Sequence, residues 1–140
     1  MKRPQIIVTL ADHKKLCALI EEQRRLHNRL PDSFRSLVTE LERAELKDSA
    51  EIAADVITMN STARVVDLET NETLEYTLVY PEMADIESGK ISVLAPLGTA
   101  MLGYREGDTF QWEVPAGARR FKVEAVIFQP ERVTQSTEAA

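Results

Sequence analysis

Two histidines and one cysteine are the side chains of this sequence best suited to acid–base or metal chemistry near neutral pH. His13 and Cys17 stand four residues apart within one expected helix, and Glu21 stands four further on, a spacing that places three metal ligands on one face. The alternative is that Cys17 is a small core residue and the other two are solvated. We favour this alternative and expect no metal or cofactor, because no second Cys or His cluster completes a tetrahedral site.

A hydrolase triad is a second possibility, since His27, Asp32 and Ser33 supply its residue types. These residues lie in or beside an expected turn between two helices, where exposed polar residues are common. The five glycines form neither a phosphate-cradling G-x-x-x-x-G-K pattern nor a dinucleotide fingerprint. We therefore predict no catalytic residues and a protein that is not an enzyme.

A carboxylate at the tip of a helical hairpin is a third possibility, because such a finger can carry an acid into another protein's active site and hold Mg²⁺ there. The expected tip spans residues 27–32, where Asp32 lies beside Arg29. Asp32 is also well placed to cap the second helix, and we favour that role.

Composition restricts the function classes further. The chain has 140 residues, of which 44% are hydrophobic and 29% charged, and a net charge of −6. The acidic balance argues against autonomous binding to duplex DNA, which requires clustered cations. No segment approaches the roughly 20 apolar residues that span a bilayer. With a single cysteine no intrachain disulfide forms, so we expect a cytoplasmic protein that does not bind membranes.

Two further groups of residues have a structural and a functional interpretation. Arg105, Arg119 and Arg120 form either a small basic patch or solvated turns. Exposed aromatic side chains could stack on single-stranded bases, but here they alternate with polar residues as core residues of strands do. We assign five of them to the core: Tyr76, Tyr80, Phe110, Trp112 and Phe121.

Helical periodicity covers residues 9–46. Thr9 is the expected N-cap, with Asp12 three residues on, and Pro31 separates two amphipathic segments. The first presents Leu16, Leu19, Ile20 and Leu26, and the second presents Phe34, Leu37, Val38, Leu41 and Ala44. This pattern predicts an antiparallel helical hairpin, or short coiled coil, whose first helix reaches only about 27 Å.

Strand periodicity follows over residues 56–128. A β-hairpin is expected over residues 62–80, further strands at 91–94, 110–114 and 121–127, and a short helix over residues 97–102 with Pro96 at N1 and Gly103 at C′. From Gln129 onward we expect a frayed tail. The fold class is α+β: a hairpin domain at 1–50, a small antiparallel β domain with one short helix at 51–131, and a disordered tail at 132–140.

The β half resembles a known family. Residues 56–62, VITMNST, and residues 91–103, ISVLAPLGTAMLG, followed by EGD at 106–108, are similar to the C-terminal domain of Gre transcript-cleavage factors. Residues 55–61, 77–81 and 93–98 and the ending FQPE at 128–131 look like the Rnk proteins, regulators of nucleoside diphosphate kinase that share this domain. Over residues 1–50 the resemblance rests on length, the opening Arg3-Pro4 and RAE at 43–45.

The resemblance implies an FKBP-like β domain and RNA polymerase as partner. Gre proteins dock this domain at the rim of the polymerase's secondary channel through a Ser-Pro loop. Here Ala95 replaces the serine, so a hydrogen bond made by that hydroxyl is not carried over. The predicted polymerase-binding residues of this rim loop are Ser92, Ala95, Pro96, Leu97 and Gly98. Arg29 and Asp32 are the candidate site residues of the hairpin tip.

The hairpin departs from the Gre pattern, in which a much longer finger carries paired acids at its tip. On a shorter hairpin the carboxylate would stop many ångströms short of the polymerase's catalytic centre. It could not share the Mg²⁺ there, because Mg²⁺ ligands lie at about 2.1 Å. We therefore predict binding without transcript cleavage. An FKBP-like fold does not by itself imply prolyl isomerase activity.

The leading hypothesis is a non-enzymatic, Rnk-like regulator that binds RNA polymerase near its secondary channel, competes with Gre factors and changes nucleoside diphosphate kinase levels indirectly. One alternative is a Gre-like stimulator of transcript cleavage in which Glu21 or Glu22 joins Asp32. Another is direct binding to nucleoside diphosphate kinase. A monomer is expected, although a short hairpin could leave Leu30 exposed for self-association.

Overall fold

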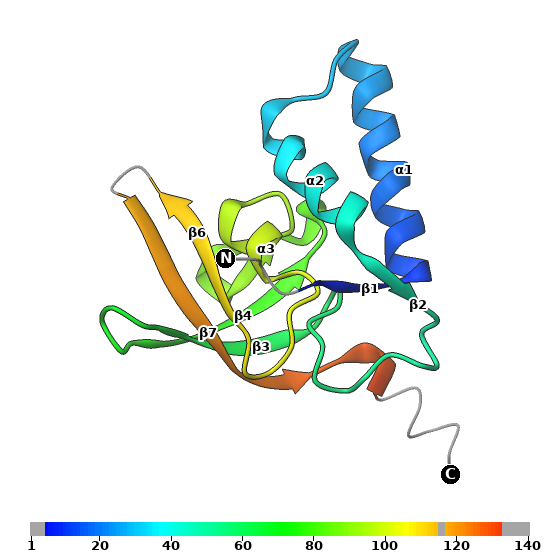
Figure 1. The fold of residues 1–140 in the computed structure, drawn as a ribbon. Helices are drawn as coiled ribbons and strands as arrows, with labels where there is room; N and C mark the ends of the chain where they lie inside the picture. Colours follow the sequence, from blue (N-terminus) through cyan, green and yellow to red (C-terminus); the bar gives the residue numbers. More distant parts are fainter. Residues whose placement is uncertain (1–4, 115–116, 133–140) are drawn as a thin grey trace.

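A helical hairpin packs beside a five-stranded mixed sheet in the computed structural model (Figure 1). The structure describes residues 5–114 and 117–132, without the side chains of Ser33, Glu113 and Val114. At the base of the hairpin, β1 (Ile7–Thr9) and β2 (Glu45–Lys47) pair as a two-stranded parallel sheet. The two ends of the hairpin are thereby tied together.

The first helix, α1 (Leu10–His27), has the predicted length and start. Thr9 is its N-cap, and the Thr9 Oγ1 accepts a hydrogen bond from the Asp12 backbone N–H at 3.0 Å. The helix ends at Asn28, whose φ of 61° is the left-handed conformation that often closes helices. The predicted hairpin of limited reach is therefore confirmed.

The second helix begins differently from the prediction. A 3₁₀ turn, η1 (Asp32–Phe34), precedes α2 (Arg35–Arg43), and neither element has a side-chain cap. The prediction that Asp32 caps this helix is wrong, because Pro31 occupies the N-cap position of the turn and the Asp32 carboxylate pairs with arginines instead. The apolar stripe is confirmed: Phe34, Leu37 and Leu41 are buried, and Val38 and Ala44 pack against them.

The large sheet has the strand order β5-β4-β3-β7-β6. Its strands are β3 (Thr62–Asp67), β4 (Thr73–Val79), β5 (Lys90–Ser92), β6 (Thr109–Val114) and β7 (Gly117–Phe128). The expectation of an antiparallel sheet is corrected at one edge, where β4 and β5 pair in parallel. Residues 80–89 return the chain through two 3₁₀ turns, η2 (Pro81–Met83) and η3 (Ile86–Ser88). Side-chain alternation is the same for both strand directions, so the sequence pattern did not distinguish them.

Strand β7 contains an irregularity that the alternation missed. Its pairing with β3 shifts register between Arg64 and Val65, whose partners are Ala125 and Val123, so that Glu124 is skipped. A bulge of this kind moves one residue to the other face of the sheet. Val126 is consequently buried, and Ile127, which was expected inside, is 41% exposed.

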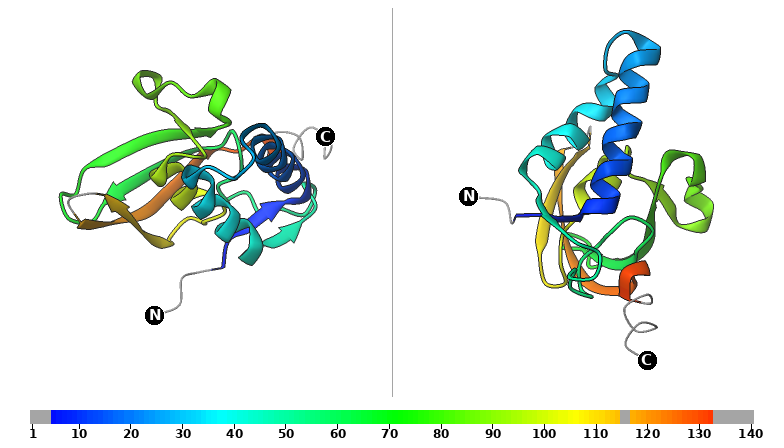
Figure 2. Two further views of the ribbon diagram at one scale, coloured as in Figure 1. Left: turned by 90° about the horizontal axis from the view of Figure 1, so that it is seen from above. Right: turned by 90° about the vertical axis from the view of Figure 1, so that its right-hand side faces the viewer.

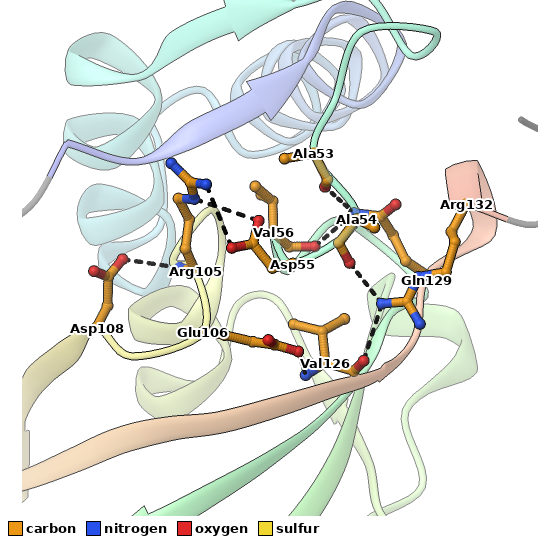
Figure 3. A network of polar contacts seen from close by, with 10 residues as sticks. All are labelled: Ala53, Ala54, Asp55, Val56, Arg105, Glu106, Asp108, Val126, Gln129 and Arg132. Atoms are coloured by element: carbon orange, nitrogen blue, oxygen red, sulfur yellow. Dashed lines mark hydrogen bonds and ion pairs between the residues drawn. The ribbon is translucent and has the colours of Figure 1, made fainter.

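The end of β7 is anchored to residues 53–56, as Figure 3 shows. The fully buried Gln129 donates from Nε2 to the carbonyl oxygens of Ala53 and Val56, both at 2.8 Å. Arg132, which the sequence placed in the tail, donates to the Ala54 and Val126 carbonyls. The prediction of a frayed tail from Gln129 onward is therefore wrong, because two backbone carbonyls accept from the buried amide nitrogen and hold the chain in place.

Hairpin and sheet share one hydrophobic core. Figure 2 shows the helices of the hairpin lying alongside the sheet. Its buried members include Ile6, Leu16 and Leu37 from the N-terminal part and Phe110 and Phe121 from the sheet. The two phenylalanine rings stack with centroids 5.9 Å apart. The core assignment of the aromatic residues is thus confirmed for these two, while Tyr76, Tyr80 and Trp112 are partly buried against the same core.

Candidate protein-docking surface

The predicted docking loop, residues 92–98, joins β5 to the short helix α3 (Pro96–Met101). Ser92 folds the loop over itself: its hydroxyl oxygen accepts from the Leu94 N–H and its carbonyl accepts from the Ala95 N–H, both at 3.0 Å. Pro96 then begins the helix at N1, as predicted, because its fixed φ suits that position. The loop is a tight turn with a defined shape.

Gly98 allows the loop to close on itself. A Cβ atom at this position would lie 1.9 Å from the Ser92 carbonyl oxygen and 2.9 Å from the Ser92 carbonyl carbon. Both are backbone atoms of the same loop, so no side-chain rotation relieves the overlap. From the helix side, the Thr99 Oγ1 donates to the Val93 carbonyl oxygen at 2.5 Å and fixes the loop a second time.

The five predicted docking residues differ in accessibility. Pro96 is exposed, and Ser92 and Ala95 are half-buried. Leu97 is only 5% exposed and belongs to the core, and Gly98 is buried as well. Contact with a partner is therefore available to the first three, whereas the last two support the loop from beneath.

The hairpin tip carries one carboxylate between two cations. The Asp32 Oδ1 lies 3.8 Å from the Arg29 guanidinium and 3.3 Å from that of Arg35. All three side chains are at least 72% exposed. Leu30, which a short hairpin could have left exposed for self-association, packs against the core, and nearby Leu26 is 63% exposed.

Among the described residues, the metal candidates do not come together as a site. The Cys17 Sγ lies 3.7 Å from the His13 Nδ1, but the Glu21 carboxylate pairs with Arg24 at 2.7 Å. Within residues 5–114 and 117–132, no three His, Cys, Asp or Glu side chains are grouped so as to hold a metal ion. The Ser33 side chain of the proposed triad lies outside the described part of the structure.

The basic patch that the three arginines could form is largely neutralised. Arg119 donates to the buried carboxylate of Asp67 and holds the pKa of that carboxyl below its usual range. Arg105 pairs with Asp55 at 3.3 Å (Figure 3). Arg120 remains exposed. Because Arg105 and Arg119 are paired with carboxylates, these three arginines are a weak footprint for nucleic acid.

Sequence reasoning missed a buried carboxylate between the two halves of the molecule. The Asp12 Oδ2 accepts a hydrogen bond from the Met59 backbone N–H at 3.0 Å. Burial raises the pKa of Asp12 to about 6, although the Met59 hydrogen bond opposes the shift. The Thr-x-x-Asp pattern identified Asp12 as part of a helix start, but nothing local indicates a partner 47 residues away.

No helix in the described part of the chain combines the length and the apolar character needed to cross a bilayer.

Two family descriptions match the chain. "Transcription elongation factor, GreA/GreB, C-term" matches residues 52–128, which contain the sheet and the docking loop. "Rnk N-terminus" matches residues 4–46, which contain the hairpin. The boundary between the two matches falls in the connector after β2.

Individual relatives match along nearly the whole chain. A regulator of nucleoside diphosphate kinase from Escherichia coli K12 is 36% identical over 132 residues, covering 94% of this chain and 95% of that protein. Transcription elongation factor GreA from Xylella fastidiosa 9a5c is 36% identical over 134 residues, covering 91% and 85%. A solved GreA/GreB factor from Nitrosomonas europaea is 36% identical and superimposes with a TM-score of 0.71, covering 90% of this chain and all of that one. The chain therefore belongs to the GreA/GreB transcription elongation factor family and carries the N-terminal region of its Rnk members.

Proposed function

We propose that this protein binds RNA polymerase near its secondary channel through the loop of residues 92–98 and competes there with Gre factors. The observation that carries the proposal is the shape of the loop: Pro96 is presented on a turn closed by Gly98 and Thr99. Membership of a family of elongation factors, over nearly the full chain, supports polymerase as the partner. Action on polymerase makes the cytoplasm the expected location.

The hairpin tip supports binding without transcript cleavage. Its carboxylate, Asp32, is paired with Arg29 and Arg35, and α1 spans only 18 residues, about 27 Å. Glu21, which the cleavage alternative would recruit, is paired with Arg24. A cleavage cofactor needs carboxylates free to coordinate Mg²⁺. The Gre-like stimulator is therefore the weaker candidate.

The test is a titration of core RNA polymerase with the protein, with GreA as competitor. Saturable binding that GreA displaces is expected. Pro96→Asp should weaken binding at least tenfold, because it places a charge on the exposed apex of the loop. Leu68→Asp, which changes an exposed apolar residue in the turn between β3 and β4, is the matched control and should bind as the unmodified protein does.

Absence of binding at micromolar polymerase would refute the proposal. Transcript cleavage in stalled complexes is measured in parallel, and the expected rate is the background rate. Cleavage above background that disappears in Asp32→Asn would favour the Gre-like alternative.

Direct binding to nucleoside diphosphate kinase is a second candidate, favoured by the name of the Escherichia coli relative. In our proposal the effect on the kinase is indirect and follows from transcription. Co-purification of the two proteins in the absence of polymerase separates the candidates. A complex that forms with purified kinase alone would support the direct alternative, and sedimentation of the isolated protein tests the expected monomer.

A further inference from the structure

Strand β6 ends the large sheet, and one of its sides is unpaired among residues 5–114 and 117–132. Its neighbour in the strand order is β7, with Thr109 opposite Lys122 and Gln111 opposite Arg120. The Val123 N–H donates to the Asp108 carbonyl at 2.9 Å, which makes that pair a hydrogen-bonded one. Because hydrogen-bonded and non-hydrogen-bonded pairs alternate in antiparallel ladders, the backbone groups of Thr109 and Gln111 point away from β7, toward the free edge.

A groove of about 530 Å³ runs beside this edge. Its walls come from α2, α3 and β6 and include Ser36, Thr39, Pro96, Ala100, Gln111 and Trp112. Adjacent residues of a strand point to opposite faces, yet Gln111 and Trp112 both line the groove. The groove therefore follows the free edge of the strand and is not confined to one face of the sheet.

The chemistry of the groove defines what fits it. The helix walls are small and uncharged at Ser36, Pro96 and Ala100, and the Glu40 carboxylate at the floor is paired with Arg43. Within the described residues the Trp112 indole N–H is buried without a hydrogen-bond partner. Main-chain donors and acceptors along one wall and small, uncharged side chains on the other are features by which sheets accept an extended peptide.

We propose that an extended segment of the partner protein adds to the free edge of β6 as a further strand, with an uncharged side chain in the groove against Trp112 and Ala100. The inference rests on the proposed function, since polymerase supplies the segment. Pro96 connects the two surfaces, because it is the apex of the docking loop and also part of the groove wall. A partner that contacts Pro96 therefore also contacts the wall of the groove.

The test removes one edge donor while leaving the sheet intact. Gln111→Pro deletes the N–H that faces the added strand, and proline is tolerated at edge positions whose N–H is not used by the sheet. Gln111→Ala retains that N–H and is the matched control. In the polymerase titration, Gln111→Pro should weaken binding at least tenfold and Gln111→Ala less than twofold, with unchanged circular dichroism and melting for both.

The single tryptophan provides a second readout that does not depend on these variants folding. Incorporation of 5-fluorotryptophan gives one ¹⁹F resonance, from Trp112, which should shift when core polymerase is added. If Pro96→Asp abolishes binding while Gln111→Pro binds normally and the resonance stays in place, the groove proposal is overturned and the proposed function stands. If the unmodified protein does not bind polymerase, both are overturned.

Discussion

The docking loop and the hairpin tip are both exposed surfaces, but different forces hold them. The loop is closed by backbone atoms of Ser92, Val93 and Gly98, which lie in close contact. The buried hydroxyl of Thr99 adds a hydrogen bond to the Val93 carbonyl. The tip is held by charges in solvent, where Asp32 lies between Arg29 and Arg35. Backbone contacts do not adapt, whereas exposed ion pairs contribute little and rearrange easily. Substitutions should therefore have large effects in the loop and small effects at the tip.

The largest effect is expected from Gly98→Ala. Its methyl group would overlap the Ser92 carbonyl, which lies 1.9 Å from the Cβ position, so the loop must open or α3 must shift. We expect a loss of at least about 3 kcal/mol in the free energy of unfolding, measured by urea denaturation, together with weaker polymerase binding.

Gly107→Ala is the control, because that glycine has φ +91° but no atom within 4 Å of its Cβ position. It should lose only about 1–2 kcal/mol, from backbone strain alone. If the two variants lost equal free energy of unfolding, the close approach of Gly98 to Ser92 would not contribute to the effect.

The second effect concerns the base of the hairpin, where Asp12 accepts from Met59. Its pKa is raised from 3.8 to about 6, so the folded protein binds this proton more tightly than the unfolded chain does. The stability contributed by that proton is complete below about pH 4 and is lost as the pH rises through about 6. Between pH 4 and pH 8 the titration of Asp12 should lower the free energy of unfolding of the unmodified protein by about 2–3 kcal/mol. Asp12→Asn cannot titrate and should not show this decrease.

Urea denaturation at several pH values measures this difference. Glu21→Gln, which changes an exposed carboxylate on the same helix, should retain the full decline. If the free energy of unfolding fell equally with pH in Asp12→Asn and in the unmodified protein, the titration of Asp12 would contribute nothing to the stability of the hairpin base.

These contrasts also explain how much of the molecule was predictable. The start of α1 and the two ends of α3 followed from Thr9, Pro96 and Gly103, because capping and backbone preferences act within a few residues. The parallel pairing of β5, the burial of Gln129 and the contact between Asp12 and Met59 depend on groups far apart in sequence. Residue type and periodicity do not encode such partners.

The same division applies to the candidate site. The loop and its proline were identified from the sequence, since the family motif is continuous there. The groove beside β6 was not identified from the sequence, because it is formed by α2, α3 and β6, which are separate in the chain. The tip was located correctly, but its capping role was wrong: Pro31 sets the start of the turn and leaves Asp32 to the arginines.

A third, smaller effect is expected from Thr99→Val, which keeps the shape of the side chain and removes the buried hydroxyl that donates to the Val93 carbonyl. The loss should be about 1–2 kcal/mol, the usual value for a buried hydrogen bond. Thr39→Val is the matched control in α2, since the Thr39 hydroxyl donates to the Arg35 carbonyl at an exposed position. It should change stability by less than about 0.5 kcal/mol. Similar losses in both would show that the loop is not held by its hydroxyl.

The smallest effect is expected at the tip, from Asp32→Asn. Both of its ion pairs are exposed and lie at 3.3 and 3.8 Å, so salt and water screen them. The change in the free energy of unfolding should stay below about 0.5 kcal/mol, and it should vanish in 0.5 M salt because the ion pairs are then screened. Polymerase affinity should be unchanged if the loop and the β6 edge supply the contacts. A tenfold change in polymerase affinity without a change in stability would instead show that the tip contacts the polymerase directly. The expected difference between a loop that binds and a tip that does not bind would then be wrong.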